Sequence, residues 1–159
     1  MSPSTALRVL LVPFLIFATH CAHAQGRTIL TLSGPDGISR DYDLAALEAM
    51  ESTTLRTHTS WTDGPQSFTG VRASTLLAAL LEQGTRVEAV ALNDYKSTLP
   101  LQDLRDYPVI IAYKRNGEYM KVRDKGPLWI IYPQDDHPLL RSLETDQKMA
   151  WQLRRLIIK

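Results

Sequence analysis

The chain has 159 residues, 44% of them apolar, and its 18 Lys and Arg residues nearly balance 17 Asp and Glu residues. This apolar content excludes a disordered chain, and the balanced charge argues against nucleic acid as a partner and against a basic membrane-binding face. No internal repeat or low-complexity linker divides the sequence. The composition therefore indicates one ordinary globular domain.

The first 24 residues have the pattern of a secretory signal peptide. Arg8 provides a positive n-region, residues 9–18 form an apolar stretch, and Ala22-His23-Ala24 fits a cleavage site before Gln25. An apolar stretch of about ten residues is too short to span a bilayer, which takes about 20. We therefore expect cleavage, export to the periplasm and a mature domain of residues 25–159 without a membrane span.

The single cysteine of the chain, Cys21, falls inside this signal. A lipoprotein interpretation would make Cys21 the acylated residue, but Ala18-Thr19-His20 before it match that pattern poorly, and cleavage after Ala24 is favoured. The mature domain is then expected to have no thiol. This excludes a disulfide, a cysteine-bound zinc, an iron–sulfur cluster and a thiolate nucleophile.

The first half of the mature sequence predicts short elements. Residues 27–33 read as a strand that ends at a Gly-Pro-Asp-Gly turn, Asp43 is placed to cap a short helix that runs to Met50, and residues 52–59 are β-prone. Residues 74–83 form the clearest helical pattern, because four leucines make one apolar stripe. Gly84 follows this pattern directly, at the position where a helix often ends with a glycine in the left-handed backbone conformation.

The second half predicts mostly strands. Residues 86–92 read as a strand, residues 93–95 as a loop and residues 101–106 as a helical turn. Asn116-Gly117 between residues 108–115 and 118–122 predicts a β-hairpin with a type I′ turn. Residues 128–132 predict an apolar strand, and the tail from 147 to 158 ends in strand-like sequence. The fold class expected is therefore α+β with a mixed β-sheet, because no regular βαβ alternation appears.

Two polar segments follow apparent strands. His58 and Trp61 lie in a loop rich in hydroxyl groups that could line a polar pocket, although a strand end with a capped turn is favoured for a lone histidine. Asn93-Asp94-Tyr95 follows a buried strand, where sites often lie, but Asn and Asp are also common turn residues.

Two charged segments have both a functional interpretation and a simpler one as solvent-exposed residues. Asp135-Asp136-His137 offers possible metal ligands, but three adjacent side chains converge poorly on one ion, so a solvated turn is favoured. The hairpin region carries basic residues that could face an anion or simply protect a sheet edge. Among them, Lys125 stands out because it precedes Gly126-Pro127. This basic cluster comprises Lys114, Arg115, Lys121, Arg123 and Lys125.

The order of these segments resembles the molybdopterin-binding oxidoreductase family, of the sulfite oxidase-type fold. The resemblance covers residues 28–158 and rests on five short segments in the order of that family. They are Trp61-Thr62-Asp63-Gly64, Phe68-Thr69-Gly70-Val71 leading into Leu76-Leu77, Ala91 to Tyr95 with Leu99-Pro100-Leu101, Ile110 to Tyr113 with Asn116-Gly117, and Lys125 to Pro133.

The resemblance implies a cofactor site and also a missing ligand. In that family a pterin dithiolene and one protein cysteine hold molybdenum, and Thr57 is the nearest counterpart of that cysteine here. A threonine hydroxyl is a hard, neutral donor and cannot replace a soft thiolate. The resemblance places a cofactor-binding pocket at Thr57, His58, Trp61, Asn93, Tyr95, Lys125 and Gly126, with no metal ligand and no catalytic residue assigned.

Three functions remain open from the sequence. The favoured one is an exported module, degenerate at the metal site, that binds a pterin or small anion or acts as a sensor. The alternatives are an active periplasmic molybdopterin-dependent oxidoreductase without a cysteine ligand, and an accessory subunit of a redox or signalling complex in the periplasm or at the membrane. The sequence itself requires no cofactor.

Overall fold

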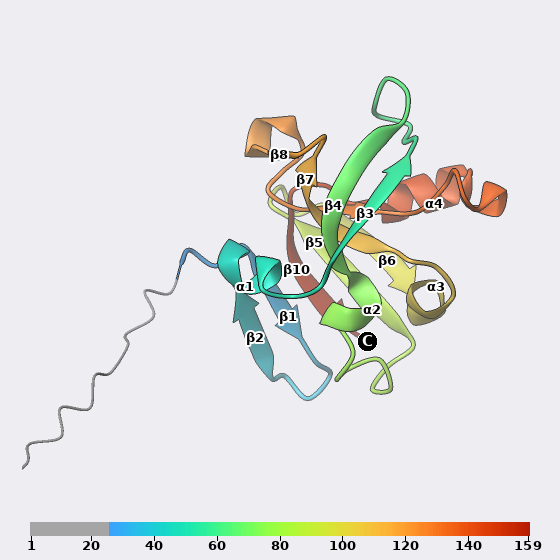
Figure 1. Ribbon diagram of the computed structural model, residues 1–159. Helices are drawn as coiled ribbons and strands as arrows, with labels where there is room; N and C mark the ends of the chain where they lie inside the picture. The colour runs from blue at the N-terminus through green and yellow to red at the C-terminus, as the bar shows by residue number, and fades with distance from the viewer. Residues whose placement is uncertain (1–25) are drawn as a thin grey trace, which may run out of the picture.

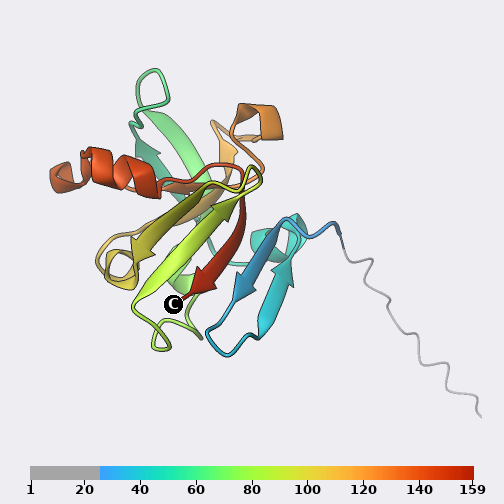
Figure 2. The same cartoon turned by 180° about the vertical axis from the view of Figure 1, so that it is seen from behind.

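A computed structural model describes residues 26–159, and the expected signal peptide with Cys21 lies outside these residues. Two β-sheets lie on opposite sides of one core, with short helices at their edges and ends (Figure 1 and Figure 2). Within residues 26–159, no helix combines the length and apolar character needed to cross a bilayer. The mixed sheets and short helices confirm the expected α+β class.

The first sheet has the strand order β2-β1-β10-β5-β6. The C-terminal strand β10 pairs parallel with β1 and antiparallel with β5, while β2 and β6 form the two edges. The strand bounds are β1 Leu30–Ser33, β2 Ser39–Tyr42, β5 Arg86–Ala91, β6 Lys96–Pro100 and β10 Leu153–Ile158.

The second sheet has the order β3-β4-β7-β8, and β9 pairs with β7 beside β8. All its strand pairs are antiparallel. The bounds are β3 Ser52–Thr57, β4 Gln66–Arg72, β7 Ile110–Arg115, β8 Glu118–Tyr119 and β9 Trp129–Ile131. An isolated bridge between Trp129 and Trp151 extends this sheet toward the segment that leads into β10.

The helices are short, and they connect the strands. Their bounds are α1 Leu44–Glu48, α2 Ala73–Leu76, α3 Leu101–Asp106 and α4 Leu143–Lys148, with 3-10 turns at Val122–Asp124 and Pro138–Leu140. Apolar side chains from both sheets fill the core, and the fully buried ones include Leu30, Phe68, Ile110, Trp129 and Tyr132. Burial of this kind contributes about 25 cal/mol per Å² of apolar surface and drives the packing of the two sheets.

Several local predictions are confirmed. Asp43 accepts a hydrogen bond from the Ala46 amide at 2.8 Å and so caps α1. Asn116 and Gly117 both have positive φ, 51° and 83°, as a type I′ turn between β7 and β8 requires. The helical turn expected at residues 101–106 is α3.

Two predictions are wrong, one of them in part. The helix expected at residues 74–83 ends at Leu76, and successive i→i+3 turns follow, such as that from the Leu80 amide to the Leu77 carbonyl. These turns still place the leucines against the core, so the apolar stripe does not require a full helix. The tail from 147 to 158 ends in a strand as expected, which is β10, after Gln147 and Lys148 complete α4.

Gly84 does not adopt the left-handed conformation that was expected of it, since its φ is not positive. A Cβ at this position would lie 2.5 Å from the Lys159 carbonyl oxygen. Glycine is therefore required here by the close approach of the C-terminal backbone, which accepts the Thr85 amide at 2.9 Å.

Candidate functional site

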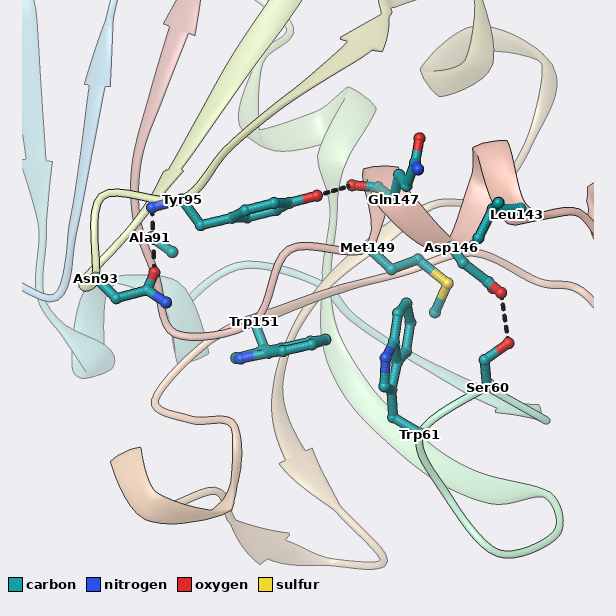
Figure 3. Close-up of a pocket in the computed structure, with 10 residues that line it drawn as sticks. All are labelled: Ser60, Trp61, Ala91, Asn93, Tyr95, Leu143, Asp146, Gln147, Met149 and Trp151. Carbon is teal, nitrogen blue, oxygen red and sulfur yellow. Dashed lines mark hydrogen bonds between the residues drawn. The ribbon is translucent and has the colours of Figure 1, made fainter.

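A cavity of about 290 Å³ lies where three segments meet (Figure 3). The loop after β3 contributes Ser60 and Trp61, and the end of β5 with the β5–β6 loop contributes Ala91, Asn93 and Tyr95. The remaining lining residues come from α4 and the chain after it: Leu143, Asp146, Gln147, Met149 and Trp151. The lining is mainly apolar with a few polar groups, which is the usual character of a small-molecule site.

Tryptophan rings form the floor and one wall of the cavity. The Trp61 and Trp151 rings meet edge to face with centroids 5.1 Å apart, and both pack on the buried ring of Trp129, at 6.2 and 6.3 Å. The Lys125 ammonium lies 4.3 Å from the centroid of Trp151. This cation–π contact holds a positive charge against a ring that lines the cavity.

Polar groups gather on the α4 side of the cavity. The Asp146 carboxylate accepts hydrogen bonds from the Ser60 hydroxyl and from the Gln134 side-chain amide, the latter at 2.9 Å. The Tyr95 hydroxyl donates to the Gln147 carbonyl at 2.9 Å and joins the β5–β6 loop to α4 (Figure 3). The site therefore combines flat apolar walls with a carboxylate and with the amides of Asn93 and Gln147.

The structure brings together some of the site residues predicted from the sequence. Trp61, Asn93 and Tyr95 line the cavity, and Lys125 contacts it through Trp151. Thr57, His58 and Gly126 do not line it. Their roles in ligand binding stay predictions. In the structure, each of the three residues makes contacts that stabilise the fold.

Thr57 is buried at the end of β3, with 1% of its surface exposed. Its hydroxyl accepts a hydrogen bond from the Asp135 amide at 3.1 Å and lies 3.3 Å from the His58 carbonyl, to which it donates. The hydroxyl is thus engaged in joining β3 to the segment after β9, and Thr57 is a structural residue in this geometry.

Gly126 is held against the chain that follows β8. A Cβ at Gly126 would lie 2.0 Å from the Met120 carbonyl oxygen, and the Gly126 amide donates to the Lys121 carbonyl at 2.8 Å. Glycine therefore permits the close approach that positions Lys125, whose φ is 71°. Its contribution to the cavity is indirect.

His58 contacts Asp135 beside a neighbouring hollow that His58, Gln134 and Arg141 line. The ring Nδ1 lies 2.8 Å from Asp135 Oδ2, the His58 amide donates to the same oxygen at 3.2 Å, and Arg141 donates to Oδ1 at 3.1 Å. The expected turn is present at residues 134–136, but Asp135 is more than a solvated turn residue, because His58, 77 positions away in the chain, contacts its carboxylate.

These contacts alter the acidity of Asp135. Burial acts to raise the pKa of its carboxyl, but the hydrogen bonds from His58, with the charges of His58 and Arg141, outweigh burial and leave the pKa below its usual value. A lowered folded-state pKa means that the ionised carboxylate stabilises the fold above its unfolded-state pKa, about 3.9. That contribution is lost as the pH falls through the folded-state pKa.

Replacement of Asp135 with asparagine should therefore lower the free energy of unfolding at pH 7 more than at pH 3. Urea unfolding at both pH values measures the two differences. Asp63→Asn, at an exposed loop carboxylate, is the matched control and should show a smaller change with pH. An Asp135→Asn effect equal at pH 7 and pH 3 would contradict the assigned contacts.

The donor set does not fit a molybdenum centre ligated by the protein. The position matched to the family cysteine holds Thr57, whose buried hydroxyl is already bonded on two sides. Across residues 26–159, no group of three or more His, Cys, Asp or Glu side chains is arranged to hold a metal ion.

Sequence reasoning missed the α4 side of the cavity. The packing of α4 near β6 brings three residues to the cavity: Asp146, Gln147 and Met149. No local sequence pattern indicates this long-range contact. A weak signal for α4 was present: Ser142 caps the helix by accepting the Thr145 amide at 3.2 Å, and Glu144 pairs with Lys148 one turn later at 2.9 Å.

The basic cluster does not act as one surface. Lys114 pairs with Glu48 at 3.4 Å and lies over the Tyr119 ring, Arg123 pairs with its neighbour Asp124, and Lys125 lies over Trp151. The hydrogen bonds from Tyr119 and Lys114 lower the pKa of Glu48, with that of Tyr119 the larger cause. Three of the five residues thus have separate partners, and only Lys125 contacts the cavity wall.

Comparison with known proteins gives a likeness in fold. No protein-family model and no curated protein matches the sequence. Among solved structures, the chain is similar to the sulfane dehydrogenase SoxCD from Paracoccus pantotrophus, with a TM-score of 0.60 and 19% identity. The match covers 81% of this chain and 37% of that one, so this chain spans little more than a third of the length of the neighbour. The likeness shows that the described domain has a fold found within a dehydrogenase.

Proposed function

We propose that the mature domain is an exported ligand-binding module that takes a small planar heteroaromatic molecule, with a pterin as the first candidate, in the tryptophan-lined cavity. We further propose that it descends from the sulfite oxidase-type molybdopterin-binding fold and has lost the metal-ligating sulfur. The order of its sequence segments and its likeness in fold to part of SoxCD support this relationship.

The observation that carries the proposal is the meeting of Trp61, Asn93 and Tyr95 in one cavity, although more than 30 positions separate the first from the other two. Aromatic walls favour a flat ring, through stacking and edge contacts. The Asp146 carboxylate on one side accepts from ring N–H or amino groups, which a pterin presents along one edge. The Lys125 ammonium behind Trp151 favours an anionic substituent.

Thr57 supports a binding role over turnover. In the resembling family a cysteine at this position would supply the sulfur that tunes molybdenum, whereas the Thr57 hydroxyl is neutral, buried and bonded within the fold. A pterin would be recognised by its ring and its polar edge alone. The proposed activity is therefore reversible binding, in a sensory or carrier role.

Trp61→Ala should weaken the binding of pterin-6-carboxylate about tenfold or more, because a stacked ring contributes about 1–3 kcal/mol. Quenching of tryptophan fluorescence, confirmed by isothermal titration calorimetry, measures the affinity. Leu139→Ala, at a leucine with 90% of its surface exposed, is the control and should leave the affinity unchanged. Equal affinity of wild type and Trp61→Ala would overturn the cavity assignment.

Metal analysis separates binding from an oxidoreductase role. Protein purified from a molybdenum-replete periplasm is expected to carry molybdenum far below one atom per chain. Stoichiometric molybdenum with bound pterin would overturn the proposed loss of metal and favour the active oxidoreductase instead.

A further inference from the structure

Another hollow lies at the outer side of the five-stranded sheet that contains β10, and it shares no lining residue with the tryptophan cavity. Figure 2 looks onto this sheet, where β10 runs between β1 and β5. The hollow has a volume of about 390 Å³, and three of the residues that line it are arginines: Arg27, Arg154 and Arg155. Apolar and hydroxyl side chains from β1 and from two loops complete the lining.

A β-bulge explains why two consecutive arginines share this hollow. Leu153 pairs with Ala91 and Arg155 pairs with Val90, so β10 advances two residues while β5 advances one, and Arg154 is the extra residue. In a regular strand, consecutive side chains point to opposite faces. Here Leu153 and Leu156 are both buried in the core, and the two arginines between them line the same outer hollow.

One donor in this hollow lacks a partner. The Arg154 guanidinium donates to Asp94 through Nη2, but its Nε is shielded from solvent and has no hydrogen-bond partner among the described residues. A buried N–H without an acceptor costs about 1–3 kcal/mol, and more when the group is charged. An acceptor from a ligand in the hollow would recover that cost.

The charges in the hollow are not balanced. Asp94 neutralises one guanidinium, while Arg27 and Arg155 form no ion pair within residues 26–159. Asp41, opposite Thr31 on β2, is engaged with the Thr31 hydroxyl, which donates to it at 2.6 Å. Two guanidinium groups are therefore available to an anion, and guanidinium forks match the paired oxygens of an oxyanion.

We infer that this hollow, the arginine pocket formed by Arg27, Arg154 and Arg155, binds a doubly charged tetrahedral oxyanion of the sulfate or phosphate class. The bulge brings Arg154 and Arg155 to the same hollow, where Arg27 and Arg155 have no ion-pair partner among the described residues, and the Arg154 Nε–H is a donor that no group of the described chain uses. The site is independent of the tryptophan cavity and of the ligand proposed there.

Calorimetric titration with sodium sulfate, against sodium chloride of matched ionic strength, tests this inference. Saturable one-to-one sulfate binding is expected, and Arg155→Gln should weaken it about tenfold or more, as expected for a lost charged hydrogen bond. Arg154→Lys keeps the charge opposite Asp94 but removes the Nε–H, and it should also weaken binding. Urea unfolding of each variant establishes that the fold is retained.

Two controls make the result decisive. Arg56→Gln removes the same charge from an exposed position on β3, in the other sheet, and should leave sulfate affinity unchanged. Trp61→Ala should also leave it unchanged, which separates this site from the pterin cavity. Sulfate heats equal to those of chloride, or equal losses in Arg56→Gln and Arg155→Gln, would overturn the arginine pocket.

Discussion

Replacement of Trp129 with alanine is expected to lower the free energy of unfolding by about 3–5 kcal/mol. Trp129 is fully buried on β9, its ring meets Phe68 edge to face at 5.4 Å, and its Nε1 donates to the Met149 carbonyl at 2.9 Å. Truncation would leave a void between the sheets and remove the donor from a buried carbonyl. Urea unfolding followed by far-ultraviolet circular dichroism measures the loss without relying on tryptophan fluorescence.

Trp129→Phe separates packing from hydrogen bonding, because it keeps an aromatic ring but removes the Nε1–H donor. It should cost less than Trp129→Ala, with about 1–3 kcal/mol attributable to the unpaired carbonyl. Since Trp61 and Trp151 rest on Trp129, both variants should also weaken ligand binding in the cavity. A loss below about 1 kcal/mol for Trp129→Ala would contradict its placement in the core.

Replacement of Gly126 with alanine is expected to lower the free energy of unfolding by about 1–3 kcal/mol or more, the range for overpacking. The added Cβ would fall 2.0 Å from the Met120 carbonyl oxygen and 2.7 Å from the Met120 Cβ. The Met120 carbonyl belongs to the backbone and cannot rotate away as the end of a flexible side chain can. The segment from β8 to Pro127 must therefore shift. That shift would also move Lys125 off the Trp151 ring.

Gly64→Ala is the matched control for Gly126→Ala. Gly64 has a φ of 63°, and a Cβ there would meet nothing within 4 Å, so alanine introduces only left-handed strain of about 1–2 kcal/mol. Thermal and urea unfolding of both variants compare a steric clash with backbone strain. A smaller loss for Gly126→Ala than for Gly64→Ala would show that the loop before Pro127 adapts freely.

Local features of the fold were predictable because their causes lie within a few residues. Asn116-Gly117 sets the β7–β8 turn through its two positive φ angles, and Asp43 caps α1 through the Ala46 amide. Helix length was less predictable. The leucines after Ala73 pack against the core from consecutive turns instead of from a continuous helix. An apolar stripe in the sequence is compatible with both arrangements.

The site was only partly predictable because its contacts join distant parts of the chain. Trp61, Asn93 and Tyr95 could be found as polar or aromatic residues in loops after strands. The pairing of His58 with Asp135 and the contact of Asp146 with Ser60 span 77 and 86 positions, and no local spacing indicates them. A β-bulge at Arg154 is likewise set by register against β5, which a single strand pattern does not reveal.

The position of β10 has a consequence for the order of folding. This strand lies at the centre of its sheet, with the β1–β2 hairpin on one side and the β5–β6 hairpin on the other. Until residues 153–158 are available, these two hairpins have no strand to join them, and the isolated hairpins are marginal in water. Closure of the sheet therefore waits for the last strand to be synthesised. The pairing of β1 with β10 joins residues more than 120 positions apart, and non-local pairings of this kind slow folding, so we expect sheet closure to be a late step.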